Sequence, residues 1–214
     1  MFGSFRRSRA TGPLAQYLAT PRPNLAAPVG ELNFLALDIE TTGLRAGRDH
    51  MLSIGWVPVT AGIIELSAAQ HFIIRAGVEV GQSATVHGLT DDHLADGTEL
   101  SEVLPLFLGA LAGRVALVHF AHIETSFLSH ACRKLYGAPL DMPVVDTFAL
   151  ERRHMERMGT YPRGEDLRLG RVRARYGLPA YRNHNALTDA LACAELYLAF
   201  VAQSRAKTLR DLMV

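Results

Sequence analysis

The sequence predicts one α/β domain: a mixed five-stranded sheet of three antiparallel strands and then parallel strands, flanked by helices. Two observations indicate this class. Apolar runs separated by turn residues come first, and from Ser101 onward helical patterns alternate with short strands. With 214 residues, 49% of them apolar, the chain can bury one sizeable core, whereas two domains would each be small.

A basic, proline-containing segment precedes the predicted domain. Residues 1–30 contain four arginines and four prolines but no acidic residue. We interpret this segment as an arm outside the core that is available to a protein partner. Its one helical piece is expected at residues 12–19, where Leu14 and Tyr17 fall on one face. The folded domain is expected over residues 31–214.

Three strands are expected to open the sheet. Phe34 to Leu37 is a short apolar run that ends at Asp38, which is typical of a buried central strand whose end meets polar chemistry. Met51 to Val59 and Ile63 to Ile74 are predicted to be two further strands around a turn at residues 60–62.

The second half of the chain is expected to alternate helices with short strands, which places helices on both faces of the sheet. Gly137 closes one of these helices, because glycine is the usual residue just past a helix end. The predicted strands are Val115 to His119 and Val144 to Asp146. The predicted helices lie near Ser101 to Ala112, Glu124 to Tyr136, Thr147 to Met158, just after Asp166, and from Ala186 to Ala206.

Composition excludes several classes of protein. Charged residues make up 20% of the chain and the formal net charge is +1, so neither disorder nor a surface that is basic throughout is indicated. The sequence also bears on location. No apolar run reaches the ~20 residues that span a bilayer, and no secretory signal follows the N-terminal arginines. Cys132 and Cys193 are expected to be unpaired. From these observations together we expect a cytoplasmic protein that contacts no membrane. The glycine motifs of nucleotide-binding switches and kinases do not occur.

Two carboxylates follow the first predicted strand. Asp38 and Glu40 are two residues apart, so a strand would place both on one face. Two like charges this close resist joint ionisation unless a cation lies between them, and Mg²⁺ or Mn²⁺ prefers such oxygen ligands. The alternative is a solvated strand end followed by an ordinary Thr-Thr-Gly turn.

A histidine and an aspartate stand at the entry to the last predicted helix. Residues five apart lie about 140° apart around a helix, so His184 and Asp189 can meet only if His184 is in the preceding loop. With Asn185 as the N-cap, Asp189 lies in the first turns, where the helix dipole favours its anionic form. A histidine just outside a metal site suits a general base that acts on metal-bound water. The alternative is a capping loop with a surface histidine.

Glu124 is a further candidate ligand. It starts the helix that follows a predicted strand, close to the sheet edge where Asp38 also ends. His119 and His122 could form a zinc site with Glu124, but no further histidine or cysteine stands at zinc-motif spacing. We expect both histidines to be buried or hydrogen-bonded in structural roles.

Together these motifs resemble the DEDDh exonuclease superfamily, which contains the proofreading epsilon subunit of bacterial DNA polymerase III, ribonuclease T and the oligoribonucleases. Asp146-Thr147 is similar to a recurrent pair that supports the site in that family. One departure is Glu124, which stands where the family usually has aspartate. The resemblance covers about residues 33–202: residues 38–44 match the first motif, residues 184–189 the third, and residues 86–90 a segment between the first two.

The resemblance implies an RNase H-like fold and a 3′→5′ exonuclease that releases nucleoside 5′-monophosphates from a single-stranded nucleic acid, DNA rather than RNA. His184 would take the proton from the attacking water. The last sugar and base would be held by the backbone of Thr41 and Thr42 and by the side chains of Leu44 and His87. Two Mg²⁺ or Mn²⁺ ions would be held by Asp38, Glu40, Glu124 and Asp189.

Local charge offers a second pointer to nucleic acid. Nine arginines lie between Arg152 and Arg182 against three acidic residues, a local net charge of +6. They are candidates to follow the phosphates of an incoming strand, although a solvated helix surface accounts for part of them.

Two alternative functions stay open. A DEDDh-like fold with Glu124 in its second metal site can bind strand ends yet cleave slowly, because a 1 Å misplacement of a catalytic group can cost about 10²-fold in rate. An RNA-trimming exonuclease would share the motifs, although the Glu-Thr-Thr-Gly-Leu form favours the proofreading branch. Because the chain ends at Val214, soon after the last predicted helix, we expect a free-standing enzyme rather than a stable polymerase subunit.

Overall fold

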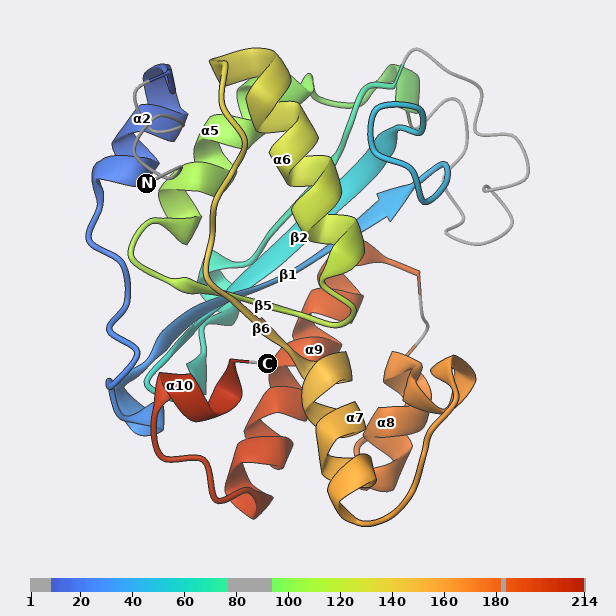
Figure 1. The fold of residues 1–214 in the computed structure, drawn as a ribbon. Coiled ribbons are helices and arrows are strands. Elements are labelled where there is room, and N and C mark those ends of the chain that lie inside the picture. Colours follow the sequence, from blue (N-terminus) through green and yellow to red (C-terminus); the bar gives the residue numbers. More distant parts are fainter. Residues whose placement is uncertain (1–8, 77–93, 182–183, 214) are drawn as a thin grey trace.

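A computed structural model of the chain describes residues 9–76, 94–181 and 184–213. It contains a mixed sheet with helices on both faces (Figure 1), as the sequence predicts. The central strand is β1 (Asn33–Thr41). On one side of it β2 (Met51–Thr60) runs antiparallel, and on the other β5 (Val115–Val118) runs parallel. β6 (Val144–Asp146) continues the parallel half beside β5.

The described sheet has six strands where the sequence predicts five. The expected strand from Ile63 to Ile74 is interrupted because residues 66–68 are exposed, so no buried face holds them in the sheet. The turn before it forms as predicted, with Ala61 and Gly62 both in the left-handed region. Three elements replace the single strand: β3 (Ile63–Ile64) and β4 (Gln70–Ile73), both paired with β2, and between them the 3₁₀ helix η2 (Leu66–Ala68).

Three helices cover one face of the sheet (Figure 1): α2 (Gly12–Ala19), α5 (Leu100–Leu111) and α6 (His122–Tyr136). Their apolar sides pack against Leu35 and Leu37, which are odd-numbered residues of β1. Gly137 ends α6 in the left-handed conformation at a φ of 76°, as predicted.

The opposite face of β1 begins with Phe34 and Ala36, which pack against a second group of helices. Because side chains alternate along a strand, Asp38 and Glu40 continue this face. The short helix α10 was not predicted, since its four residues are too few to show a helical pattern. The group consists of α7 (Thr147–Arg157), α9 (Ala186–Gln203) and α10 (Leu209–Leu212), with the 3₁₀ helix η4 (Gly164–Leu167) and α8 (Leu169–Arg175) between α7 and α9.

By length and apolar composition, α9 alone among the helices that the structure describes could cross a membrane. In this fold it is a core helix that lies across β1 and β2, with Ala190, Cys193 and Ala194 buried. Cys193 belongs to the core on this face and Cys132 to the core on the other face, so the two thiols are unpaired, as expected.

The interpretation of residues 1–30 as an arm outside the core is wrong for the part that the structure describes. The helix α2 forms as predicted, but Leu14 is 0% exposed and Tyr17 is 8% exposed in the core with α5 and α6. After the 3₁₀ helix η1 (Val29–Glu31) the chain enters β1. Just before η1, the chain is hydrogen-bonded to the segment around α10, where the backbone N–H of Leu209 donates to the carbonyl of Ala27 (3.1 Å). The expected protein partner of residues 1–30 stays a prediction.

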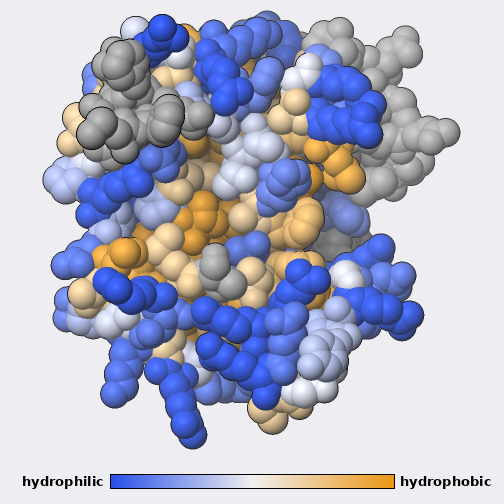
Figure 2. Space-filling view, in the orientation of Figure 1, coloured by the Kyte–Doolittle hydropathy of each residue, from blue (hydrophilic) through white to orange (hydrophobic). Residues whose placement is uncertain are grey.

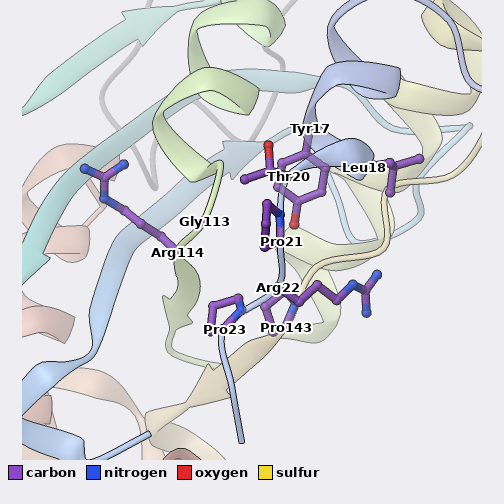
Figure 3. Close-up of a pocket in the computed structure, with 9 residues that line it drawn as sticks. All are labelled: Tyr17, Leu18, Thr20, Pro21, Arg22, Pro23, Gly113, Arg114 and Pro143. Atoms are coloured by element: carbon purple, nitrogen blue, oxygen red, sulfur yellow. The ribbon is translucent and has the colours of Figure 1, made fainter.

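The prolines that suggested a free arm instead shape a connection that lies against the domain. Figure 3 shows Pro21, Arg22 and Pro23 around a small cavity that Pro143 also lines. Proline fixes φ in a packed connection as well as in a free one, which is why composition misled. The cavity has a volume of about 10 Å³, which is room for one water at most, so it is not a ligand site.

Replacing Leu14 with alanine tests the corrected role of α2. Because Leu14 is fully buried, we expect Leu14→Ala to lower the free energy of unfolding by about 2–5 kcal/mol in urea denaturation. The control is Leu25→Ala, because Leu25 is 42% exposed and its truncation should cost no more than about 0.5 kcal/mol. Equal effects of the two substitutions would mean that α2 does not belong to the core.

Candidate active site

Asp38 and Glu40 lie at the end of β1, on the face that α9 covers. In the register with β2, Asp38 is opposite Gly55 and Glu40 is opposite Ser53. The register then shifts between Glu40 and Thr41. Irregularities of this kind often re-aim side chains beside active sites. The structure thus places both carboxylates on one face of the strand.

The N-terminus of α9 brings His184 and Asp189 to the same place. Asn185 caps the helix, and its side-chain oxygen accepts a hydrogen bond from the backbone N–H of Thr188 (3.1 Å). His184 precedes the cap in the left-handed conformation, and its backbone N–H donates to Asp189 Oδ2 (2.9 Å). Ligand atoms of Glu40, His184 and Asp189 all lie within 4.8 Å of one another.

Gly55 makes this close approach of α9 and β2 possible. A Cβ on Gly55 would stand 2.3 Å from the backbone nitrogen of Leu187 and 2.6 Å from the carbonyl carbon of Ala186. No side chain fits in that space, so the first turn of α9 can lie against β2 only where β2 has glycine. Sequence reasoning missed Gly55, although a glycine inside a strand pattern is a signal of close backbone approach.

Glu124 reaches the site from the first turn of α6 and is only 3% exposed. The start of α6 is fixed by Asp146, which also caps α7. The Asp146 carboxylate accepts hydrogen bonds from the backbone N–H groups of Phe120 (2.9 Å), Ala121 (3.0 Å) and Phe148 (2.9 Å). Asp146 is therefore a structural support that determines where Glu124 stands.

The four carboxylates affect one another's protonation. Burial raises the pKa of Asp38 well above its usual value, and the charges of Glu124, Glu40 and Asp189 raise it further. Burial, followed by the charge of Asp189, raises the pKa of Glu40 to about 7. Burial is also the main cause that raises the pKa of Glu124 to about 8. The same cause raises the pKa of Asp189, although the His184 backbone N–H opposes it. The structure thus gathers the four acidic residues into one cluster.

The donor set of this cluster fits divalent cations. Glu124 Oε2 and Asp189 Oδ1 are buried and receive no hydrogen bond from the part of the chain that the structure describes. A buried carboxylate oxygen without a donor is costly unless a cation neutralises it. Carboxylate oxygens are the ligands that Mg²⁺ and Mn²⁺ prefer. His184 lies at the exposed side of the cluster.

The alternative of a zinc site with His119 is wrong, because both of its ring nitrogens are occupied. Nδ1 pairs with Thr147 Oγ1 (2.8 Å) and Nε2 with the carbonyl of Leu167 (2.7 Å). Burial lowers the pKa of His119, which favours a neutral ring in this structural role. His122 does not share that role, because it is exposed at the start of α6, so the prediction for this residue is wrong.

Three of the four residues predicted to hold a terminal nucleotide lie at the end of β1 and in the turn after it. Thr41 Oγ1 donates to the carbonyl of Gly43 (2.7 Å), and Leu44 is 72% exposed, so its apolar side chain is accessible to a ligand. The backbone N–H of Thr42 donates to the carbonyl of His50 (2.9 Å), so this N–H is not free to donate to a nucleotide as expected. His87 lies outside the described residues.

Several arginines between residues 152 and 182 have structural partners. Arg173 is 2% exposed and donates to the carbonyl of Ala192 (2.6 Å) and to Glu195 (2.8 Å). The Tyr181 ring lies against its guanidinium, and the Tyr181 hydroxyl donates to Glu195 (2.8 Å). This cluster fastens the chain before His184 to α8 and α9, so Arg173 supports the fold rather than following phosphates. Sequence reasoning missed it because the partners are distant in the chain.

The site and fold can be compared with known proteins. Residues 35–197 match the RNase_T family, whose description is exonuclease. The chain belongs to this exonuclease family. It is 32% identical, over 80% of its length, to a DNA polymerase III of the PolC type from Thermotoga maritima. It is 31% identical, over 79% of its length, to the DNA polymerase III subunit epsilon of Treponema pallidum. It spans 12% of the length of the first relative and 76% of the second.

A solved structure shows the same fold. The nuclease domain of 3′hExo, a DEDDh family member bound to rAMP, superposes with a TM-score of 0.68 at 13% sequence identity, covering 83% of this chain and 96% of that one. This likeness confirms the RNase H-like fold class, and the family match with the identity to the epsilon subunit confirms the resemblance to DEDDh exonucleases. Exonucleases of this family generally use two divalent metal ions.

Adding a methyl group at Gly55 tests the approach of α9 to β2. Because a Cβ would collide with the backbone of α9, we expect Gly55→Ala to displace Asp189 and to lower kcat/KM by about 10²-fold, a loss typical of a 1 Å misplacement. The stabilisation that Mn²⁺ gives against thermal unfolding should fall as well, which a simple loss of packing would not cause. The control is Gly109→Ala in α5, where a Cβ meets nothing within 4 Å. Unchanged activity of Gly55→Ala would contradict this role.

Stability without metal should depend on pH in a defined direction. Because the folded state holds the Glu124 proton up to about pH 8, whereas a free carboxyl releases it near pH 4.5, folded protein binds more protons than unfolded protein between these values. Stability in EDTA should therefore fall as the pH rises through this window, and millimolar Mg²⁺ should restore more of it at pH 8 than at pH 6. Each kcal/mol shifts the Tm of a chain this long by about 2–4 °C, which thermal scans resolve.

Glu124→Gln should weaken this pH dependence, since the amide does not titrate. Glu102→Gln, at an exposed position of α5, should leave it unchanged. A Tm of the parent protein that rises with pH in EDTA would be the opposite of the expected sign.

Proposed function

We propose that the chain removes nucleotides one at a time from the 3′ end of a single-stranded nucleic acid, DNA in preference to RNA, and releases nucleoside 5′-monophosphates. The observation that carries this proposal is the gathering of Glu40, His184 and Asp189, with ligand atoms within 4.8 Å of one another, beside the half-buried Asp38 and the buried Glu124. Family membership supports exonuclease chemistry at these residues.

Two cations would be held by the carboxylate cluster. Asp38, Glu40 and Asp189 would hold the first, and Asp38 and Glu124 the second. When bound, Mg²⁺ or Mn²⁺ stabilises charge on the reacting phosphate and makes water a stronger nucleophile. The protein positions these oxygens through β1, α6 and α9, which are fixed elements of the core.

His184 would accept the proton of the attacking water. Its ring shares the site with Glu40 and Asp189, and the residue is exposed, so the proton can pass on to solvent. The hydrogen bond from the His184 backbone to Asp189 ties the loop to the helix, which keeps the ring near the cluster. Buried Arg173 holds the chain that precedes this loop, because it donates to the carbonyl of Pro179 and lies over the Tyr181 ring.

The preference for DNA at a 3′ end is inferred from relatives and from one motif. The similar PolC-type and epsilon proteins are named as parts of DNA polymerase III, and the Glu-Thr-Thr-Gly-Leu form favours that branch. RNA trimming is the second candidate, because 3′hExo, which shares the fold, was solved with rAMP. We also propose a cytoplasmic location, where unpaired Cys132 and Cys193 stay reduced.

The geometry of Glu124 favours an active enzyme over a binding module. Although Glu124 replaces the usual aspartate, its side chain is buried, and the nearby charge of Glu40 contributes to its raised pKa. Its Oε2, which accepts no hydrogen bond from the described residues, is available to a cation. The longer side chain thus stands in the cluster rather than outside it.

An assay of 5′-labelled single-stranded DNA and RNA tests the proposed activity. We expect a ladder of products shortened from the 3′ end with Mg²⁺ or Mn²⁺, faster with DNA, and none with EDTA. Asp38→Ala and His184→Ala should each lower kcat by at least about 10²-fold, since general base catalysis alone contributes that much. Glu102→Ala, at an exposed site on α5, is the matched control. Products that persist in EDTA or with Asp38→Ala would sink the proposal.

Shortening Glu124 separates the enzyme from the binding module. Because the glutamate stands in the cluster, Glu124→Asp should withdraw its oxygens by about 1 Å and lower kcat/KM by about 10²-fold. A sharply faster Glu124→Asp protein would instead identify the native glutamate as a defect and favour the binding module. Both variants are measured on the same labelled DNA with saturating Mn²⁺.

A further inference from the structure

A second cavity lies far from the carboxylates, between the C-terminal ends of α7 and α9 and the short helix α10. Its volume is about 710 Å³, within the range of small-molecule sites. Phe200, which lines it, is eleven residues after Asp189 on α9, or about 17 Å along the helix. Figure 2 shows strongly hydrophilic side chains over the part of this face where Figure 1 places α7.

The lining of this cavity is strongly cationic. Arg153, Arg157, Arg205 and Arg210 line it, against Asp211 as the one acidic residue of the lining. Asp211 Oδ2 already accepts hydrogen bonds from the backbone N–H groups of Lys207 and Thr208, both at 2.9 Å. Within the described residues, none of these four arginines forms an ion pair with a carboxylate. Among the described residues, the lining of the cavity therefore carries more positive than negative charge.

The cations are also crowded. Arg153 is half-buried and donates to the backbone carbonyl of Asp211. Burial, and then the charge of Arg157, lower the pKa of Arg153. Like charges held together in this way favour binding of an anion, which removes their repulsion.

Aromatic side chains form another part of the wall. The rings of Tyr176 and Phe200 are 6.5 Å apart, and both are half-buried. The Tyr176 hydroxyl donates to Glu151 (2.9 Å), which fixes that ring. Aromatic rings beside arginines are the combination with which proteins hold a nucleobase and its phosphate.

We propose that this cavity binds a nucleoside phosphate, with the phosphate on Arg157 and Arg205 and the base against Tyr176 and Phe200. The ligand is either a free nucleotide or one nucleotide of a strand, since both offer the same phosphate and base. An acidic peptide would match the arginines but would leave the aromatic wall without a specific partner. Binding here needs no catalysis, so it can be measured in a protein that cannot cleave.

The test uses the full chain with Asp38→Ala, in EDTA, to remove cleavage and cation binding. Added to this background, Arg157→Gln/Arg205→Gln removes two charges from the cavity. Arg133→Gln/Arg152→Gln removes two exposed charges from elsewhere on α6 and α7 and is the matched control. The probes are dTMP, thymidine, a labelled twelve-nucleotide thymidine strand, and an acidic hexapeptide. Amide chemical shifts of Phe200, Gln203 and Ala206 report binding at the cavity.

We expect saturable shifts of these amides with dTMP, with the strand, or with both, but none with thymidine. The cavity variant should bind at least about tenfold more weakly than the control variant. For the strand, the slope of log affinity against log salt should fall by about 1.4 in the cavity variant, the share of two lost phosphate contacts. Shifts with dTMP identify a free-nucleotide site, and shifts with the strand alone identify a strand site.

Three results would overturn the proposal. One is the absence of saturable shifts with both dTMP and the strand. Another is equal weakening by the cavity and control variants, which would indicate general charge rather than a site. The third is tighter binding of the acidic hexapeptide than of either nucleotide probe, which would identify a peptide site.

Discussion

The approach of α9 to β2 at Gly55 is the contact on which the carboxylate cluster depends. Asp38 and Asp189 are far apart in sequence. Burial, and then the charges of Glu124, Glu40 and Asp189, raise the pKa of Asp38, so its charged form opposes this arrangement. The energy that holds them together comes from the apolar side of α9, where Cys193, Ala194 and Tyr197 are buried against the sheet. The core thus stabilises an arrangement that the carboxylates alone would not adopt. A bound cation would reduce the repulsion among them.

Asp146 does for Glu124 what Gly55 does for Asp189. Its carboxylate accepts hydrogen bonds from the backbone N–H groups of Phe120 and Ala121, which fixes the turn between β5 and α6. The helix that carries Glu124 therefore starts at a set position, and the extra methylene of glutamate only has to extend into the cluster. A backbone held this firmly determines where the Glu124 side chain starts.

The sequence was sufficient where local pattern and tertiary position agree. Three features each predict their structure from a few neighbouring residues: the strand before Asp38, the helix start at Asn185 and the helix end at Gly137. It was insufficient where distant contacts decide. The burial of Leu14 depends on α5 and α6, and the role of Arg173 depends on Glu195, so composition alone suggested a free arm and a solvated basic surface. Gly55 is an intermediate case. A glycine inside a strand signals a close backbone approach, but the sequence does not show that α9 is the element that approaches.

The two ends of α9 carry opposite chemistry, which the near-zero net charge of the chain conceals. Asp189 lies in the first turn, where the helix dipole favours anions, and Arg205 follows the C-terminal end, where the dipole favours cations. One helix thus separates an acidic cluster suited to metal ions from a basic cavity suited to phosphate.

An acidic cluster repels a polyanionic substrate until cations fill it. Positive charge at the far end of the same helix offers such a substrate attraction that does not depend on the metal. The division of charge along α9, rather than total charge, is therefore the electrostatic feature that matters for a nucleic acid ligand.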